Sequence, residues 1–371
     1  MIDEIAKKDY HRIFLLTTPS MAKRGLLQPI LEKFNQMKVE VTVYDDVQPD
    51  PLYSTVDRAA VKARHKNCQA ILAMGGGSVM DAAKVVSLAI TNEKSAADLI
   101  GFRKAKVKPI PVFSIPTTAG TGSEVTIASV VSNDKDHQKG FVIDSRTVSK
   151  MTALDGSLMQ SVPPELTAAT GVDALTHALE AYVGNMATKE TDALAISAIQ
   201  KIFNHLLAAY LNGQDLEARQ ALSQASFEAG MCITRASVGY VHAMSHQLGA
   251  HYGVPHGMGN AILLTRIMRF SEPKIRTKLA SLAHHLDLAV PGDSETTLAQ
   301  RFIYALENLM SELNIPKQVS VLRDEDIPAM AKAACAEAQW NYPVPKFMSV
   351  KTCGSIFKEF LAEVEPSKRA A

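Results

Sequence analysis

The sequence predicts an α/β domain followed by an all-helical (all-α) domain. Over residues 1–150, short apolar runs alternate with helical patterns, which is typical of a mostly parallel sheet covered by helices. From about Pro163 onward the pattern is helical, with little strand signal. Pro163 and Pro164 also suit the start of a helix. We therefore expect the α/β domain to cover residues 1–158 and the helical domain to cover residues 159–371.

Each expected element follows from a local pattern. Short runs of apolar and β-branched residues predict strands at residues 12–18, 39–45, 70–76, 110–116 and 128–133. Between them, apolar residues at helical spacing predict helices near 21–37, 53–66 and 78–91. The second domain shows the same helical spacing over 163–182, 191–211, 217–231, 275–287 and 296–313.

Composition and charge limit the possible partners. The 371 residues are 47% hydrophobic, which is enough to bury one large core or two. The net charge is +1 and 21% of the residues are charged, so we expect neither a nucleic acid nor a membrane as partner. The four cysteines show no paired spacing, which indicates free thiols in a reducing compartment. No signal-peptide core and no run of about 18 apolar residues occurs, so a cytoplasmic protein is expected.

A glycine-rich turn follows the third expected strand. In "AILAMGGGSVMDAAK", Gly75, Gly76 and Gly77 let the backbone turn tightly and approach a ligand with no side chain between them. Ser78 then opens a helix, whose free N–H groups and dipole favour a phosphate. The pattern differs from the G-x-G-x-x-G fingerprint, and a tight turn without a ligand is the alternative interpretation.

A second polar loop follows the fourth expected strand. The stretch "IPTTAGTGSEVT" offers hydroxyl side chains, among them Thr117, Thr118 and Thr121, that can donate hydrogen bonds to a sugar–phosphate ligand. Taken alone, it is equally compatible with a polar loop that binds nothing. Two loops after two parallel strands lie at the carboxyl edge of the sheet, where α/β proteins bind ligands. Together they predict a dinucleotide site.

An acid and an imidazole share one face of an apolar helix in the second domain. Asp173 and His177 lie four residues apart in "GVDALTHALEAY", so both side chains can reach a single point. Packing needs neither of them at these positions. For this pair alone, a hydrogen bond within the helix or a satisfied core histidine is the alternative interpretation.

Four of the eleven histidines gather in one stretch further along the chain. The stretch "HAMSHQLGAHYGVPHG" contains His242, His246, His251 and His256, and the first two have the spacing of one helical face. Packing explains such a density poorly. Three imidazoles and a carboxylate can hold a divalent transition metal and leave one position free for substrate. We therefore expect histidines of this stretch to complete a metal site with the Asp-x-x-x-His pair.

The motifs together resemble those of the iron-dependent (group III) alcohol dehydrogenases. "GGGSVMDAAK", "PTTAGTGSE", "GVDALTHALEAY" and "HAMSHQLGAHYGVPHG" occur in the order typical of that family, and the similarity runs from the first strand to at least residue 265. The resemblance implies a Rossmann-like dinucleotide-binding domain, an all-helical domain, and a metal and active site in the cleft between them. It also implies the metal ligands, which would be Asp173, His177, His242 and His256.

The resemblance assigns roles to the remaining motif residues as well. His246 is expected beside the nicotinamide and the substrate, as a catalytic proton relay. Cofactor contacts are expected from Gly76, Gly77, Ser78, Thr117, Thr118 and Thr121. The metal is expected to be Fe(II), with Zn(II) as the leading substitute. It would polarise a small alcohol or aldehyde while NAD or NADP carries the hydride, and a homodimer is implied as the assembly.

The chain departs from the family pattern at several places. Its first strand begins after only eleven residues, without the further opening strand that commonly helps to form the dimer. Thr18 stands where NAD-preferring relatives often carry an Asp that would repel a 2′-phosphate, so NAD and NADP both stay open. Ala128 replaces an Asn found in relatives that oxidise small diols. Arg235 is expected at the surface or between the domains, with a contact to a substrate carboxylate as the alternative.

Other functions are compatible with parts of the pattern. A cyclase resembling dehydroquinate synthase, or a metal enzyme resembling glycerol dehydrogenase, would share the fold. The cyclase, however, normally has a Glu among its metal ligands and a pocket rich in Lys and Arg, which these helices do not offer. A non-catalytic dinucleotide-binding or metal-storage protein would keep both sites without turnover.

Overall fold

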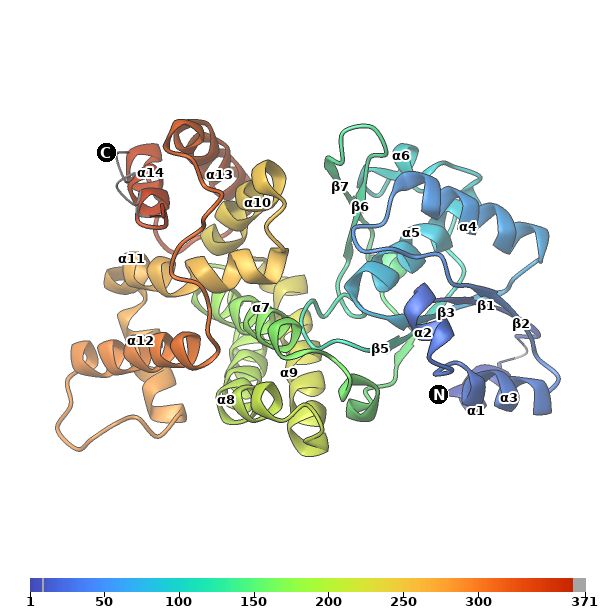
Figure 1. The fold of residues 1–371 in the computed structure, drawn as a ribbon, viewed down its shortest axis with the longest axis horizontal. Coiled ribbons are helices and arrows are strands. Elements are labelled where there is room, and N and C mark those ends of the chain that lie inside the picture. The colour runs from blue at the N-terminus through green and yellow to red at the C-terminus, as the bar shows by residue number, and fades with distance from the viewer. Residues whose placement is uncertain (9, 363–371) are drawn as a thin grey trace, which may run out of the picture. The chain divides into compact units, whose positions relative to one another are not determined.

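A five-stranded parallel sheet forms the base of the first of two compact units in the computed structural model, which describes residues 1–8 and 10–362. The strand order is β2-β1-β3-β5-β8, and every neighbouring pair is parallel. The strands are β1 Arg12–Leu16, β2 Glu40–Tyr44, β3 Ala70–Gly75, β5 Val112–Pro116 and β8 Met151–Thr152. The parallel sheet that strand–helix alternation predicted is thus confirmed (Figure 1).

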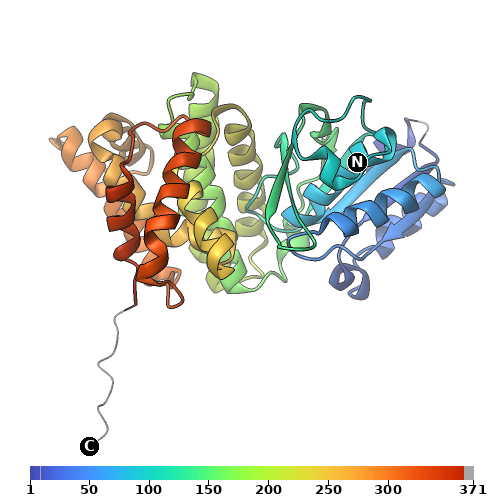
Figure 2. The ribbon, with the colours of Figure 1, turned by 90° about the horizontal axis from the view of Figure 1, so that it is seen from above.

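Helices cover both faces of this sheet (Figures 1 and 2). Phe14 and Leu16 of β1 join one core with α4 and α5, whereas Ile13 and Leu15 join another with α1, α2 and α3. Alternate side chains of a strand point to opposite faces, so a sheet that is buried on both sides needs apolar strands throughout. The covering helices are α1 Ile2–Ala6, α2 Pro19–Lys23, α3 Gln28–Gln36, α4 Tyr53–His65 and α5 Gly77–Asn92.

Two expectations for this unit need correction. The helical pattern near 21–37 is two helices, because Gly25 takes a left-handed backbone (φ 71°) between α2 and α3. The strand expected at 128–133 exists as β6 (Ala128–Ser132), but it pairs antiparallel with β7 (Lys139–Ile143) in a separate sheet of order β4-β7-β6. The shorter elements of the unit are β4 Gly101–Phe102, α6 Ala96–Leu99 and the 3-10 turns Ser145–Thr147 and Gly156–Met159.

The second unit comprises Pro163–Asn212 and the chain from Arg235 on, and it is built from helices, as the sequence predicted. Its helix α7 packs against α8 and α11, while α13 packs against α10 and α14. The sequence analysis had assigned no helix to the stretches of α13 and α14. The helices are α7 Pro164–Val183, α8 Lys189–Leu211, α10 Tyr240–Tyr252, α11 His256–His285, α12 Glu295–Glu312, α13 Ile327–Asn341 and α14 Val350–Lys358, with a 3-10 turn at Asp324–Asp326.

One helix from the second half of the chain packs with the first unit. Most of α9 (Leu216–Ala236) lies in the segment Gly213–Thr234, which belongs to that unit. Gly122, with φ 58°, and Gly230 of α9 approach so closely that a Cβ on either residue would lie within 2.7 Å of an atom of the other. Both positions therefore need glycine, and this contact fixes α9 against the loop that follows β5.

Among the described helices, only α8 has the length and apolar composition that would allow it to cross a membrane. Its apolar residues also have a partner within the protein, since Ala195, Ile199 and Ile202 are fully buried and the helix packs against α7. A capping box at Thr188 and Thr191 begins the helix. The helix therefore buries one face against the protein, as an amphipathic helix does.

Candidate metal centre and cofactor loops

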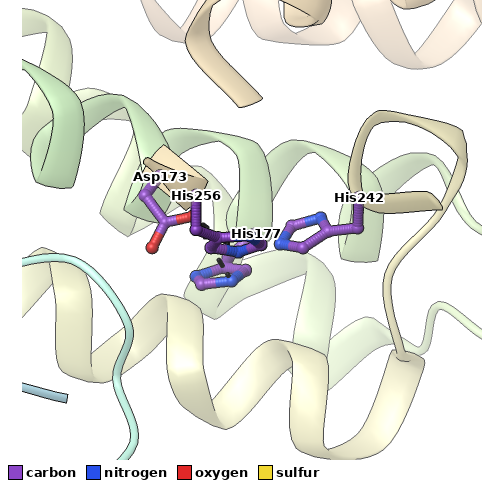
Figure 3. Close-up of side chains that lie close together, drawn as sticks. All are labelled: Asp173, His177, His242 and His256. Atoms are coloured by element: carbon purple, nitrogen blue, oxygen red, sulfur yellow. Dashed lines mark ion pairs between the residues drawn. The ribbon is translucent and has the colours of Figure 1, made fainter. Parts of the chain in front are cut away.

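Three histidines and one aspartate converge in the second unit (Figure 3). One ligand atom from each of Asp173, His177, His242 and His256 lies within 4.8 Å of the others. Asp173 Oδ1 is 3.9 Å from His177 Nε2 and 3.6 Å from His256 Nε2. The rings of His177 and His242 stack with their centroids 4.8 Å apart. The fold thus brings all four residues that were expected to bind a metal to one place.

Three helices supply these side chains. Asp173 and His177 project from one face of α7, one turn apart. His242 lies in the first turn of α10, and His256 is the first residue of α11. α11 can begin this close to α7 because the residue after His256 is Gly257, where a Cβ would lie 2.5 Å from a carbonyl oxygen of α7. Any side chain at that position would push the start of α11 away from Asp173.

The protonation states of the cluster suit a divalent cation. Burial lowers the pKa of His242 and His256 well below the usual range, so both rings are neutral and each offers a lone pair. Burial opposes ionisation of Asp173, but the neighbouring histidines and Asn260 outweigh it and lower the pKa of this carboxyl. The ionised carboxylate of Asp173 and the lone pairs of His242 and His256 are donors of the kind that transition-metal sites use, and with His177 beside them these residues fit a metal.

A buried glutamate orients His242. Glu180 lies on α7, seven residues after Asp173, and its side chain is 3% exposed. Its carboxylate accepts hydrogen bonds from His242 Nδ1 at 2.6 Å, from the Gly239 N–H at 2.8 Å and from the Val241 N–H at 2.7 Å. Burial raises the pKa of Glu180 to about 7. Bonding at Nδ1 leaves Nε2 of His242 for the cluster. Glu180 was not predicted as a site residue, although its spacing from Asp173 places both on one helical face.

Asn260 of α11 lies among the ligand atoms. Its Nδ2 donates to Asp173 Oδ1 at 2.7 Å and lies 3.2 Å from His242 Nε2 and 3.3 Å from His256 Nε2. Asn260 Oδ1 and His177 Nδ1 are both buried without a hydrogen-bond partner. Unpaired buried polar atoms are rare, and two of them in residues of this cluster agree with a site that binds a further group. The sequence analysis missed Asn260, because one amide in a helix carries no spacing signal.

His246 lies next to the cluster, one turn after His242 on α10. Its ring stacks on that of His256 with centroids 5.3 Å apart, and its centroid is 6.0 Å from that of His242. Its Nδ1 is 2.7 Å from Glu337 Oε1. By contrast, His251 of the same stretch is exposed, and its Nδ1 bonds a backbone carbonyl of its own helix. The structure therefore brings His246, and not His251, to the four predicted ligands.

In the first unit, the two predicted loops meet at the carboxyl edge of the parallel sheet. β3 and β5 are paired up to Gly75 and Pro116, and the Thr117 N–H donates to Gly75 O at 2.9 Å. The neighbouring strand β1 is followed by Thr18, whose hydroxyl caps α2 by accepting from the Met21 N–H at 3.3 Å. Polar residues after three adjacent strands thus share one edge, as parallel strands require.

Glycines permit the close contact between these loops. A Cβ on Gly77 would lie 2.7 Å from Thr121 Cγ2, and one on Gly76 would lie 3.1 Å from Thr118 Oγ1. Gly76 is also the N-cap residue of α5, and it provides no side-chain cap. The first turn of α5, which contains Ser78, therefore offers an uncapped helix N-terminus that suits an anion.

Buried charges of α5 brace the second loop. Lys84 is 1% exposed and donates to Ala128 O at 2.7 Å. Asp81 accepts from Ser123 Oγ at 2.5 Å and lies 3.7 Å from Lys84 Nζ. Burial raises the pKa of Asp81, raises that of Glu124 to about 7, and lowers that of Lys84. The loop is therefore held in place by charges that the sequence analysis had not singled out.

Arg235 lies in the last turn of α9 and is exposed. Its charge helps to lower the pKa of Glu190, after hydrogen bonds within the first turn of α8. Of the two interpretations that the sequence left open, the exposed side chain agrees with the surface position.

A parallel sheet with polar loops at one edge, together with a helical unit that carries three histidines and a carboxylate, defines a class of metal-dependent, dinucleotide-linked oxidoreductases. Comparison with known families is more specific. Residues 1–156 match the family model of iron-containing alcohol dehydrogenase, and residues 167–361 match the C-terminal model of the Fe-containing alcohol dehydrogenase family. The chain belongs to the iron-containing alcohol dehydrogenase family. It is an oxidoreductase of alcohols and aldehydes, so the family resemblance is confirmed.

Similar proteins support this assignment over nearly the whole chain. Alcohol dehydrogenase 4 of Saccharomyces cerevisiae is 36% identical over 340 residues, which cover 91% of this chain and 87% of that protein. A crystal structure of 1,3-propanediol oxidoreductase superimposes with a TM-score of 0.91 at 32% identity, covering 96% of this chain and 95% of the other. Sulfoacetaldehyde reductase from Bifidobacterium kashiwanohense, in complex with NAD+, gives a TM-score of 0.87 at 26% identity and covers 97% and 93%.

Proposed function

We propose that this dehydrogenase acts through a divalent metal held by Asp173, His177, His242 and His256. The proposal rests on the convergence of four ligand atoms within 4.8 Å of one another, with an ionised Asp173 and neutral His242 and His256 among them. The family description supports Fe(II), and nitrogen and oxygen ligands would also accept Zn(II). When bound, the metal supplies Lewis-acid polarisation of an alcohol or carbonyl oxygen. The cluster contains no glutamate, which argues against the cyclase alternative.

NAD or NADP is the proposed hydride carrier, bound at the polar edge of the parallel sheet. The uncapped first turn of α5 would receive the pyrophosphate. A solved relative in complex with NAD+ supports a nicotinamide cofactor. In this proposal residues 1–158 bind the cofactor and residues 159–371 bind the metal. The proposed cofactor contacts are Thr18, Gly76, Gly77, Ser78, Thr117, Thr118 and Thr121.

His246 is the proposed catalytic residue for proton transfer. In alcohol oxidation its imidazole would take the hydroxyl proton while the nicotinamide takes the hydride, and aldehyde reduction would reverse both transfers. An imidazole suits this task near neutral pH. The names of two solved relatives, 1,3-propanediol oxidoreductase and sulfoacetaldehyde reductase, support a small primary alcohol or its aldehyde as substrate.

Metal analysis and turnover measurements on two variants test these assignments. His256→Ala should lose the metal and all turnover, while keeping its fold and its affinity for the nicotinamide cofactor. His246→Ala should keep metal and cofactor but lose roughly 10²-fold or more in kcat. Full metal content with normal activity in His256→Ala would remove this residue from the ligand set. Metal loss in His246→Ala would show that His246 itself is a ligand.

We further propose that the enzyme is a cytoplasmic homodimer that interacts with neither nucleic acid nor membrane. The near-neutral charge and the four buried cysteines, which form no disulfide with one another, support this proposal. Sedimentation equilibrium of the purified enzyme tests the dimer, and fractionation of the source cells tests the location.

A further inference from the structure

A glutamate and a tyrosine lie on the Nδ1 side of the His246 ring. His246 Nδ1 lies 2.7 Å from Glu337 Oε1, and the Tyr342 hydroxyl donates to the same oxygen at 2.6 Å. The side chains of His246 and Glu337 are 21% and 23% exposed, so both are mostly buried but keep some contact with solvent. The pair joins α10 to α13, which pack against each other. This arrangement holds His246 through the nitrogen that faces α13.

The end of α13 holds the glutamate in place. Asn341 Nδ2 donates to Glu337 O at 2.9 Å, and the Tyr342 N–H donates to Ala338 O at 3.0 Å. Burial and then the charge of Glu337 raise the pKa of Tyr342, so the phenol stays protonated and acts as the donor. Glu337 Oε1 therefore accepts from both neighbours, and its position does not depend on His246 alone.

A neutral imidazole has one N–H, so the hydrogen bond at one nitrogen decides what the other nitrogen can do. When Nδ1–H of His246 donates to Glu337, Nε2 carries the lone pair. We propose that Glu337, held by Tyr342, is the positioning residue that fixes His246 in this tautomer, so that Nε2 exchanges the proton with the substrate oxygen. The inference rests on the proposed role of His246 in proton transfer.

The proposed step transfers one proton and one hydride. In alcohol oxidation the substrate O–H bond breaks and an Nε2–H bond forms on His246. The hydrogen on the same carbon leaves as hydride to the nicotinamide, and the C=O bond forms. Glu337 stabilises the resulting imidazolium through Nδ1–H without taking its proton, and His246 later releases the Nε2 proton to water. Aldehyde reduction reverses each transfer.

Glu337→Gln in the metal-loaded enzyme tests the proposal. The amide oxygen can take the place of Oε1 and still accept from both His246 Nδ1 and the Tyr342 hydroxyl, so the tautomer is kept. What is lost is the negative charge that stabilises the imidazolium. We expect kcat to fall by roughly 10²-fold or more, with metal content, KM and cofactor Kd near wild type. Glu337→Asp should recover part of the loss, because it restores a carboxylate. The matched control is Glu307→Gln, which removes a half-buried glutamate paired with Arg269 and should leave kcat unchanged.

The tautomer itself can be observed. Imidazole ¹⁵N shifts of the diamagnetic zinc-loaded enzyme should show His246 protonated at Nδ1 in the wild type and in Glu337→Gln, whereas Glu337→Leu, which removes the acceptor, should lose this preference for Nδ1. Tyr342→Phe should keep the wild-type tautomer and lose less activity, because it removes only the support of Glu337. A wild-type His246 that is protonated at Nε2 would overturn the proposal.

Combining two substitutions separates positioning from a general structural effect. The double variant His246→Ala, Glu337→Gln should turn over no more slowly than His246→Ala, because Glu337 acts through the imidazole. Independent, multiplying losses would overturn the proposal. If His246→Ala is as fast as the wild type, the proposed role of His246 fails and the inference with it. If His246→Ala is slow and Glu337→Gln is not, only the inference about Glu337 fails.

Discussion

The candidate metal centre of the helical unit and the proposed cofactor loops of the α/β unit are built in opposite ways. The candidate metal centre consists of side chains: four potential ligand atoms lie within 4.8 Å of one another, and Glu180 and Asn260 hold two of the four residues. The cofactor loops depend on the absence of side chains, since a Cβ on Gly77 would lie 2.7 Å from Thr121. Chemical identity therefore matters at every position of the first site. At the cofactor loops, the size of the residues and the backbone conformation matter more. The charges of Asp81 and Lys84 lie on α5 and support the second loop from outside it.

This contrast predicts separable losses. Substitutions in the helical unit should change metal affinity and leave cofactor binding intact, because none of the four proposed metal ligands belongs to the α/β unit. Substitutions in the loops should do the reverse. A variant in either group that lost both affinities would break the comparison, since it would mean that one site depends on the other for its shape.

The largest effect is expected from Gly77→Ala. The added methyl group would collide with Thr121, and relieving the clash moves one loop away from the other. Overpacking of this kind costs about 1–3 kcal/mol, so the Kd for NAD(H) should rise by up to about 100-fold while metal content stays constant. Nicotinamide fluorescence titration measures the Kd. Gly354→Ala is the matched control, because a Cβ there makes only ordinary contacts of 3.6 Å or more. Unchanged affinity in Gly77→Ala would show that the loops tolerate side chains.

Glu180→Gln addresses the other site. Glu180 accepts from His242 and Gly239 at one oxygen and from Val241 at the other, so the NH2 group of an amide would face at least one N–H donor. This conflict should displace the side chain that holds His242. Loss of such a partner typically costs about 10- to 100-fold in metal affinity. Competition with a chelator measures this change. The control is Glu272→Gln, another glutamate of the helical unit, which pairs with Arg276. Wild-type metal affinity in Glu180→Gln would mean that the helices alone position His242.

The same contrast explains how much the sequence could predict. Apolar periodicity is a local property, so four of the five strands of the main sheet were predicted, whereas β8 (Met151–Thr152) is too short to show a pattern. Asp173 and His177 were visible because four residues separate them on one helix. Glu180, by contrast, can be recognised as a site residue only from its contact with His242, 62 residues away. In the same way, Glu337 is recognised only from its contact with His246, 91 residues away. Such pairs form only when helices pack, and no local spacing records them.

The pairing of β6 with β7 could not be predicted for the same reason, because it depends on contacts that no local pattern shows. The run at 128–133 has the composition of a strand, but composition does not say which strand it will pair with. The grouping of α9 with the α/β unit rests on contacts such as that between Gly122 and Gly230, which joins residues over 100 positions apart. The family resemblance implied the proposed ligand set. Glu180 and Asn260, which hold two members of this set, could be recognised only from the structure.

A smaller effect is expected from Glu124, a buried acid within the second of the cofactor loops. Burial raises the pKa of Glu124 to about 7, above its ordinary value of 4.5. The folded state therefore prefers the protonated form, and the stability that this preference contributes is present below pH 4.5 and is lost as the pH rises through 7. Relative to Glu124→Gln, the wild type should lose roughly 2 kcal/mol of unfolding free energy between pH 5 and pH 8. Urea unfolding of both proteins at the two pH values measures the difference. Parallel pH profiles would show that Lys84 keeps Glu124 ionised in the folded state.

The smallest effect concerns cofactor choice and Thr18. No carboxylate stands directly after β1 to repel a 2′-phosphate, so we expect the wild type to discriminate between NAD(H) and NADP(H) by about tenfold or less, roughly 1.4 kcal/mol. Thr18→Asp should shift the preference strongly toward NAD(H). The variant should fold normally, because Asp caps a helix at least as well as Thr and the Met21 N–H keeps an acceptor.

Thr18→Asn is the matched control for this substitution. Asn also caps a helix and is close to Asp in size, but it carries no charge, so it should leave the ratio of kcat/KM for the two cofactors near the wild-type value. A shift with Asp but not with Asn would assign the discrimination to charge. A wild type that already rejects NADP(H) by several orders of magnitude would contradict the prediction. The carboxylates of Asp45 and Asp46, which directly follow the neighbouring strand β2, would then be the next residues to replace.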